Sequence, residues 1–96
     1  GQFPHKILSL PNLEKLNLQG TGLTNIPLKI DQLTHLKELN LAGNHLSLFP
    51  HEILSLSNLE KLSLKNTHLT SIPFEIDQLS QLIELDLSDN RLNEFP

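Results

Sequence analysis

The sequence predicts an α/β solenoid in which short parallel strands alternate with helical turns. Three observations predict it: leucines recur every 23 residues, an L-x-L pattern follows each recurrence, and a proline precedes a second apolar stretch in every repeat. The 96 residues suffice for one domain. Because each coil of a solenoid packs mainly against its neighbours, the fold needs no central core. We therefore expect four coils, which begin near residues 13, 36, 59 and 82.

The L-x-L pattern predicts one strand in each coil. Side chains alternate across a strand, so Leu16 and Leu18 point to one side while Lys15, Asn17 and Gln19 point to the other. The leucine columns hold Leu13, Leu36, Leu59 and Leu82, then Leu16, Leu39, Leu62 and Leu85, then Leu18, Leu41, Leu64 and Leu87, then Leu23, Leu46, Leu69 and Leu92. Four such strands are expected to stack in parallel.

The proline column predicts a helical turn on the opposite side of each coil. Proline fixes φ, needs no N–H donor and suits the start of a helix, and the apolar residues after it recur at a spacing of three. This spacing indicates a 3₁₀ turn or a short α turn. The column holds Ile26, Phe49, Ile72 and Phe95, which precede Pro27, Pro50, Pro73 and Pro96.

With these columns, the chain resembles the leucine-rich-repeat family over residues 3–96, in the 23-residue form with a P-x-x-I-x-x-L stretch. The resemblance implies a right-handed solenoid, with a short curved parallel sheet on the concave side and 3₁₀ or short helical turns on the convex side. We interpret residues 1–2 as a cloning remnant or an internal cut. Residues 3–96 are then one domain without evident caps.

One column of polar residues is expected to turn inward beneath the strands. Asparagine there offers two donors and an acceptor to the backbone of adjacent coils, whereas threonine offers one hydroxyl. The family pattern favours asparagine, so the two threonines predict weaker or water-assisted coupling at the first and third coils. This structural ladder consists of Thr21, Asn44, Thr67 and Asn90.

The true repeat is a pair of coils, because residues 3–50 match most of residues 49–96. On the convex side, the apolar residue of each coil changes place at every step. This alternation predicts a shared apolar seam and places His51 diagonal to Asp31 and Asp77, where protonation of the imidazole would favour pairing. The seam consists of Leu8, Leu28, Leu54 and Phe74.

The family resemblance makes the outward side of the strands the candidate binding surface. Its residues are Lys15, Asn17, Gln19, Glu38, Asn40, Ala42, Lys61, Ser63, Lys65, Glu84, Asp86 and Ser88. The first column alternates in charge and is expected to stabilise the sheet as much as to serve a ligand. Lys61, Lys65, Glu84, Asp86 and Asp89 have the better claim to contacts. No aromatic residue stands on this face, so a partner is expected to reach the loops with Gly22, His45, His68 and Arg91 as well.

Composition and spacing exclude several functions. A formal net charge of −4 with scattered Lys and Arg argues against nucleic acid, and no apolar run approaches the length that crosses a membrane. His45 and His68 share a column, but no third strong ligand is spaced for a metal site. The acidic residues near Asp86 lack the glycine spacing of a calcium loop. We expect no metal, no cofactor and no catalytic residue.

The sequence therefore predicts a non-enzymatic protein–protein interaction module, a fragment of a longer repeat array that binds through its concave face and adjacent loops. The alternative is a structural or self-associating segment, natural or engineered. Such a segment would form homo-oligomers by stacking end to end through uncapped coils, with Phe3-Pro4 of one copy continuing Phe95-Pro96 of another.

Overall fold

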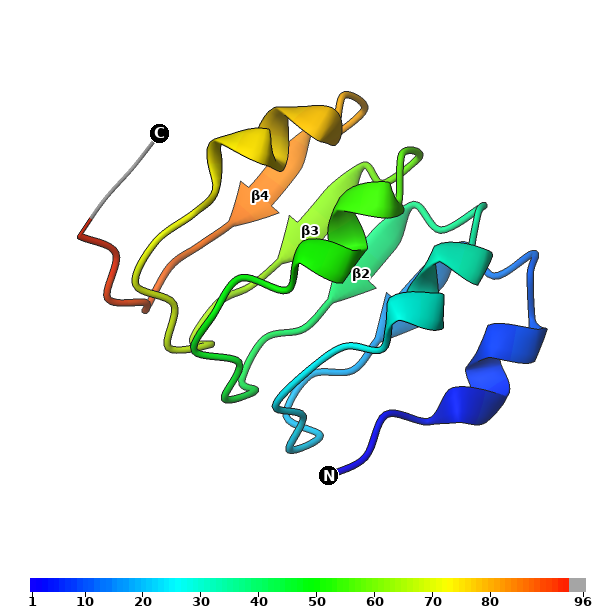
Figure 1. The fold of residues 1–96 in the computed structure, drawn as a ribbon, viewed down its shortest axis with the longest axis horizontal. Helices are drawn as coiled ribbons and strands as arrows, with labels where there is room; N and C mark the ends of the chain where they lie inside the picture. The colour runs from blue at the N-terminus through cyan, green and yellow to red at the C-terminus, as the bar shows by residue number, and fades with distance from the viewer. Residues whose placement is uncertain (94–96) are drawn as a thin grey trace.

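Four short strands form one parallel sheet in the computed structural model, which describes residues 1–93 (Figure 1). The strands are β1 (Lys15–Asn17), β2 (Glu38–Asn40), β3 (Lys61–Ser63) and β4 (Glu84–Asp86), in the order β1-β2-β3-β4. Each follows a helical turn: η1 (His5–Ser9), η2 (Leu28–Gln32), η3 (His51–Ser55) and η4 (Phe74–Gln78). The predicted solenoid is confirmed. Phe95 and Pro96, the last members of the proline column, lie outside the described residues.

The strands pair in the register that the repeat predicts. Leu16 pairs with Leu39, Leu39 with Leu62, and Leu62 with Leu85. The hydrogen bonding continues past the strand ends, where the Leu18 N–H donates to the Asn40 carbonyl at 2.8 Å. Because neighbouring strands differ by one whole repeat, identical leucines stack on the inner side of the sheet.

The convex turns are 3₁₀ helices of five residues, which decides between the two kinds of turn that the sequence allowed. In each turn, a backbone N–H donates to the proline carbonyl three residues earlier, as Ile30 does to Pro27 at 3.1 Å. The prolines occupy the N-cap position, one residue before the turn. No α-helix occurs between residues 1 and 93, so the convex layer is 3₁₀ throughout.

The apolar core lies between the sheet and the turns. Leu41 and Leu64 are fully buried, and Ile30 and Ile53 close the core from the convex side. Leu85 differs, because it is 39% exposed whereas Leu39 and Leu62 in the same column are 2% exposed. The two inner coils have a described neighbour on each side, which explains their deeper burial.

Asn44 joins the first two coils through a buried side-chain amide that is 1% exposed. Its Nδ2 donates to the Leu18 carbonyl at 3.0 Å and the Leu41 carbonyl at 2.9 Å. Its Oδ1 accepts from the Leu23 N–H at 2.9 Å and the Thr21 N–H at 3.2 Å. The amide thus satisfies backbone groups of two coils at once.

Asn90 makes the same bonds from the fourth coil to the third. Its Nδ2 donates to the Leu64 carbonyl at 2.8 Å, and its Oδ1 accepts from the Thr67 and Leu69 N–H groups, both at 3.0 Å. Thr67 Oγ1 lies 2.7 Å from the Leu64 carbonyl of its own coil and 3.2 Å from Asn90 Oδ1, so its hydroxyl makes no described bond to the second coil. At this place the second and third coils meet through a backbone bond, from the Ser47 N–H to the Thr67 carbonyl at 3.0 Å.

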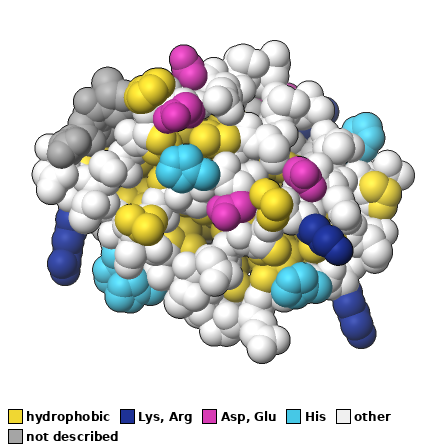
Figure 2. Space-filling view, viewed as in Figure 1, with side chains coloured by type: hydrophobic (Ala, Val, Ile, Leu, Met, Phe, Trp, Pro, Cys, Tyr) yellow, Lys and Arg dark blue, Asp and Glu magenta, His cyan; other side chains and the backbone are white. Residues whose placement is uncertain are grey.

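The predicted convex seam is wrong in part. Leu8 and Leu54 pack against the core, but Leu28 is 75% exposed and Phe74 is 72% exposed. The reason is position: the first residue of every turn is exposed, whereas the fourth lies beside the core when it is apolar. On the face that carries the turns, some hydrophobic side chains project and others lie deeper, with histidines and carboxylates beside them (Figure 2).

His51 does not form the predicted pair with Asp31 or Asp77. Its Nδ1 lies 3.1 Å from the Phe49 carbonyl, and its ring stands edge-on to the Phe49 ring, with 5.7 Å between centroids. Neither ion pair of the described residues involves His51. The imidazole therefore packs locally, on the residue two positions before it.

The buried amide of Asn44 generates a stability prediction. Asn44→Ala leaves two carbonyls and two N–H groups without their partner, and we expect the free energy of unfolding to fall by about 2–4 kcal/mol. Asn58→Ala is the control, because Asn58 is exposed and makes one side-chain bond, to the Thr34 carbonyl. Urea unfolding followed by circular dichroism measures both. Equal losses in the two variants would contradict the assignment.

Candidate functional site

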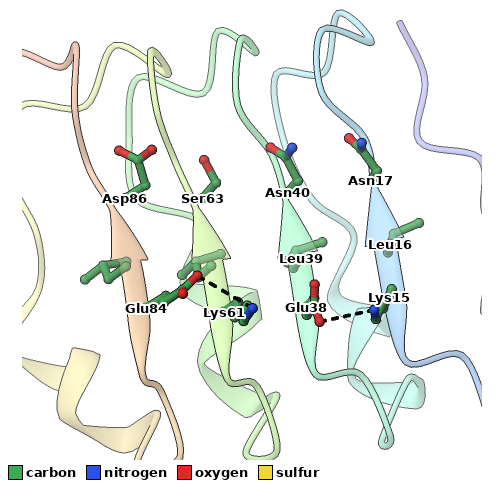
Figure 3. Close-up of a pocket in the computed structure, with 12 residues that line it drawn as sticks. Lys15, Leu16, Asn17, Glu38, Leu39, Asn40, Lys61, Ser63, Glu84 and Asp86 are labelled. Atoms are coloured by element: carbon green, nitrogen blue, oxygen red, sulfur yellow. Dashed lines mark ion pairs between the residues drawn. The ribbon is translucent and has the colours of Figure 1, made fainter.

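The concave side of the sheet forms a hollow of about 760 Å³ that all four strands line (Figure 3). Two columns of outward side chains stand over it, one at the start and one at the end of each strand. The first column holds Lys15, Glu38, Lys61 and Glu84, and the second holds Asn17, Asn40, Ser63 and Asp86. The structure thus brings eight of the twelve residues expected on this face to one surface.

The first column forms two ion pairs. Lys15 Nζ lies 3.5 Å from Glu38 Oε2, and Lys61 Nζ lies 3.9 Å from Glu84 Oε2 (Figure 3). The register would allow a third pair between Glu38 and Lys61, but the described ion pairs join only the first coil to the second and the third to the fourth. All four side chains are substantially exposed, so each pair contributes less than about 1 kcal/mol.

The second column ends each strand with a side-chain turn. Asn17 Oδ1 accepts from the Gln19 N–H at 3.0 Å, and Asn40 Oδ1 accepts from the Ala42 N–H at 2.9 Å. Ser63 makes a longer bond of the same kind. Asn and Asp favour such turns because their oxygen reaches the backbone two residues on. One oxygen of each side chain is therefore engaged internally, while the Asn17 amide N–H groups donate to none of the described residues.

The third expected column lies beyond the strand ends, and its members differ in how much surface they offer to a partner. It consists of Gln19, Ala42, Lys65 and Ser88. Ala42 is 5% exposed, so it offers almost no surface to a partner, contrary to the strand alternation from which it was predicted. The strand ends at Asn40, and the chain then turns inward toward Asn44. Gln19 is exposed and accepts a hydrogen bond from Asn40 Nδ2 at 3.2 Å. Lys65 and Ser88 are also exposed.

Asp89 occupies a position where the backbone is in the left-handed region. Its φ is 58°, and Gly20, Gly43 and Asn66 hold the same left-handed turn in the other coils, with φ of 63°, 70° and 55°. Aspartate and asparagine tolerate this region better than other side chains with a Cβ. The turn therefore explains the residue type, which weakens the expectation that Asp89 is there to contact a ligand.

The Asp86 carboxylate of this face accepts two hydrogen bonds from Ser88. The Ser88 hydroxyl donates to Asp86 Oδ1 at 2.6 Å, and the Ser88 N–H donates to the same oxygen at 3.0 Å. These two bonds, with a smaller contribution from the Lys65 charge, hold the pKa of Asp86 below its ordinary value. Its second carboxylate oxygen remains available to a partner as an acceptor.

The two loop histidines stack instead of converging. The His45 and His68 rings lie 4.0 Å apart between centroids with an interplanar angle of 17°. Nitrogen lone pairs lie in the ring planes, so in stacked rings they point side by side and do not meet at one ion. Residues 1–93 contain no group of three His, Cys, Asp or Glu side chains arranged for a metal. None of their helices is long and apolar enough to cross a membrane.

Sequence reasoning missed a second, smaller hollow, of about 250 Å³, at the loop edge of the solenoid. It lies between residues 24–26 and residues 46–52. One signal was present in the repeat: Leu48 is apolar where Asn25 and Ser71 are polar. Periodicity gave no reason to single it out, because the residue fills no core column.

The Ser88 bonds generate a titration prediction. Ser88→Ala removes the hydroxyl donor, so we expect the pKa of Asp86 to rise toward its ordinary value, measured by carboxyl carbon NMR. A carboxylate with a lowered pKa in the folded state stabilises the fold above its unfolded pKa, and the contribution disappears as pH falls through the folded pKa. Stability in the variant should therefore depend less on pH in that acidic window. Ser55→Ala is the control, and an equal shift there would contradict the assignment.

Comparison with known proteins agrees with this geometry. The family model described as "Leucine rich repeat" matches residues 34–92, and the model "Leucine Rich repeats (2 copies)" matches residues 11–55. The mouse protein "Leucine-rich repeat protein 1" is 46% identical over 44 residues, which are 46% of this chain and 10% of that protein.

Two solved structures share the fold. A leucine-rich-repeat protein of Leptospira interrogans matches with 32% identity and a TM-score of 0.71, covering 100% of this chain and 31% of that chain. Internalin C2 of Listeria monocytogenes matches with 30% identity and a TM-score of 0.79, covering 92% of this chain and 38% of that chain. The chain thus spans well under half the length of each relative. With its repeat columns, parallel sheet and family match in agreement, the chain belongs to the leucine-rich-repeat family.

Proposed function

We propose that the chain is a non-enzymatic protein–protein interaction module, one segment of a longer repeat array, which binds through its concave face and the adjacent loops. The observation that carries the proposal is the hollow of about 760 Å³ over the sheet. Leucine-rich-repeat domains commonly bind proteins, and the chain covers only 31% and 38% of the two solved relatives.

The chemistry of the face favours a polar partner. The Asn17 amide supplies donors, Asp86 supplies a fixed negative charge, and Lys65 supplies a positive charge beside it. The two ion pairs of the first column offset their own charges, so specificity rests mainly on the second and third columns.

The size of the face limits its affinity. A standard interface uses about 20–30 residues on each side, whereas the strands offer at most twelve side chains, of which Ala42 is buried. We therefore propose that a partner also contacts the loop edge at His45, His68 and Arg91, or reaches further coils of the array. By itself this segment is expected to bind weakly.

We propose no catalytic chemistry for the concave face. The Glu38 and Glu84 carboxylates lie in ion pairs, and Asp86 accepts two bonds from Ser88. A hydrolase would need a nucleophile hydrogen-bonded to a base that a third group orients, whereas the Ser88 hydroxyl meets only Asp86, whose lowered pKa makes it a poor base. The bonds of the described concave residues serve turns and pairs instead, and repeat domains of this family are typically non-catalytic.

Self-association is the second candidate, and the exposed apolar residues of the fourth coil favour it. Leu85 is 39% exposed and Ile83 is 72% exposed, while Glu14, Lys37 and Glu60 occupy the column of Ile83. A second copy whose first coil packed against β4 would cover both residues and pair the open edge of the strand.

Partner capture tests the concave proposal. We expect Ser63→Arg, which fills the hollow, to abolish capture of proteins that the unmodified chain retains. Ser57→Arg makes the same chemical change at an exposed turn shortly before β3 and should leave capture unchanged. Quantitative mass spectrometry of material bound to the three immobilised chains is the measurement. Identical profiles for all three would rule out the concave face.

A concentration series tests the second candidate. If the chain serves mainly as an interaction module, sedimentation velocity should show a monomer from micromolar to millimolar concentration. If end-to-end stacking is its role, the unmodified chain associates over this range. Ile83→Lys, which restores the residue type of Lys37, then returns it to a monomer. Association that persists unchanged in Ile83→Lys would contradict stacking through the fourth coil.

A further inference from the structure

The second hollow, at the loop edge, has apolar walls and room for one side chain. Ile26, Leu46, Phe49 and Pro50 contribute to its lining, and its volume is about 250 Å³. A cavity of about 150 Å³ already holds a six-membered hydrocarbon ring. The hollow therefore has room for an aliphatic or aromatic side chain from another molecule.

Leu48 stands at this hollow and is 77% exposed. A tight turn holds it there, because its N–H donates to the Leu46 carbonyl at 2.7 Å and the preceding Ser47 has a φ of 64°. A single exposed leucine would need no explanation. Here, however, it adjoins an open apolar hollow, at a place where the neighbouring coils carry Asn25 and Ser71.

The polar side of the hollow includes acceptors, beside Thr24 and Asn25, which can both donate and accept. The His51 Nδ1 faces a carbonyl, which only accepts, so this nitrogen carries the proton and Nε2 of the neutral ring is left as an acceptor. Glu52 adds a carboxylate from the next position of η3. The hollow has no Lys or Arg among its lining residues. A side chain with N–H donors and positive charge complements this rim.

We infer that this hollow is a docking pocket for a partner protein, in which one aliphatic side chain packs on Leu48 while an adjacent Lys or Arg binds Glu52 and His51. The rim charge selects the basic residue, and the formal net charge of −4 makes a second copy of this chain an unfavourable occupant. The pocket lies outside the concave face, so the inference does not depend on the concave proposal.

Dipeptide probes test the pocket directly by NMR. The ¹⁵N-labelled chain is titrated with N-acetyl-Leu-Arg-amide, with N-acetyl-Leu-Glu-amide and N-acetyl-Ala-Arg-amide as comparisons. We expect saturable shifts at the amides of residues 24–26 and 46–52, with the Leu-Arg probe binding at least about threefold tighter than either comparison. Shifts confined to the strands, or no saturable shift, would overturn the inference.

Matched variants separate the two halves of the pocket. Leu48→Ser should weaken the Leu-Arg probe at least about fivefold. Leu28→Ser changes an equally exposed leucine on the convex face and should leave affinity within about twofold. Glu52→Gln should abolish the preference for arginine over glutamate. Equal effects of the two leucine variants, or an unchanged preference in Glu52→Gln, would overturn the inference. If Leu48→Ser lowers the melting temperature, the probe affinities of Leu48→Ala and Glu52→Gln decide whether the pocket binds as inferred.

Discussion

The buried amide of Asn44 is the interaction on which the stacking of coils depends most clearly. Parallel coils bring backbone carbonyls and N–H groups into the interior at the end of every strand, where water does not reach them. Asn44 meets groups of its own coil and of the preceding one with a single side chain. Leucines supply the bulk of the burial, and another apolar side chain of similar volume can replace one of them. The amide has no such substitute, because removing it leaves polar groups buried without partners.

Side-chain hydrogen bonds and ion pairs, unlike the continuous apolar core, divide the described part of the solenoid into two pairs of coils. Asn44 and the Lys15–Glu38 ion pair join the first pair, while Asn90 and the Lys61–Glu84 ion pair join the second. Between the pairs, backbone bonds continue, and the stacked rings of His45 and His68 cross the junction. The duplicated sequence unit is therefore also a unit of side-chain bonding, laid over a backbone ladder that runs through all four strands.

Internal bonding also limits which groups of the candidate binding face can contact a partner. Many strand-outward residues already bond within the solenoid, through ion pairs in one column and side-chain turns in the next, and the remaining groups are free for a partner. The remaining groups include the Asn17 amide N–H groups, Lys65 and the second oxygen of Asp86. The hollow at the loop edge is different, because the Leu48 side chain is 77% exposed and a tight turn holds it outward.

The sequence by itself determined the solenoid, the strand register and the outward columns, because a strict 23-residue recurrence allows each leucine only one neighbour in the next coil. It left the kind of turn open, and it misplaced Leu28, Phe74 and Ala42. Their exposure depends on where a turn begins or a strand ends. Tertiary structure also decided the stacking of His45 on His68, the turn of His51 toward Phe49 and the hollow beside Leu48. Those features depend on the direction that each side chain takes between neighbouring coils, and the residue type at a repeat position does not specify that direction.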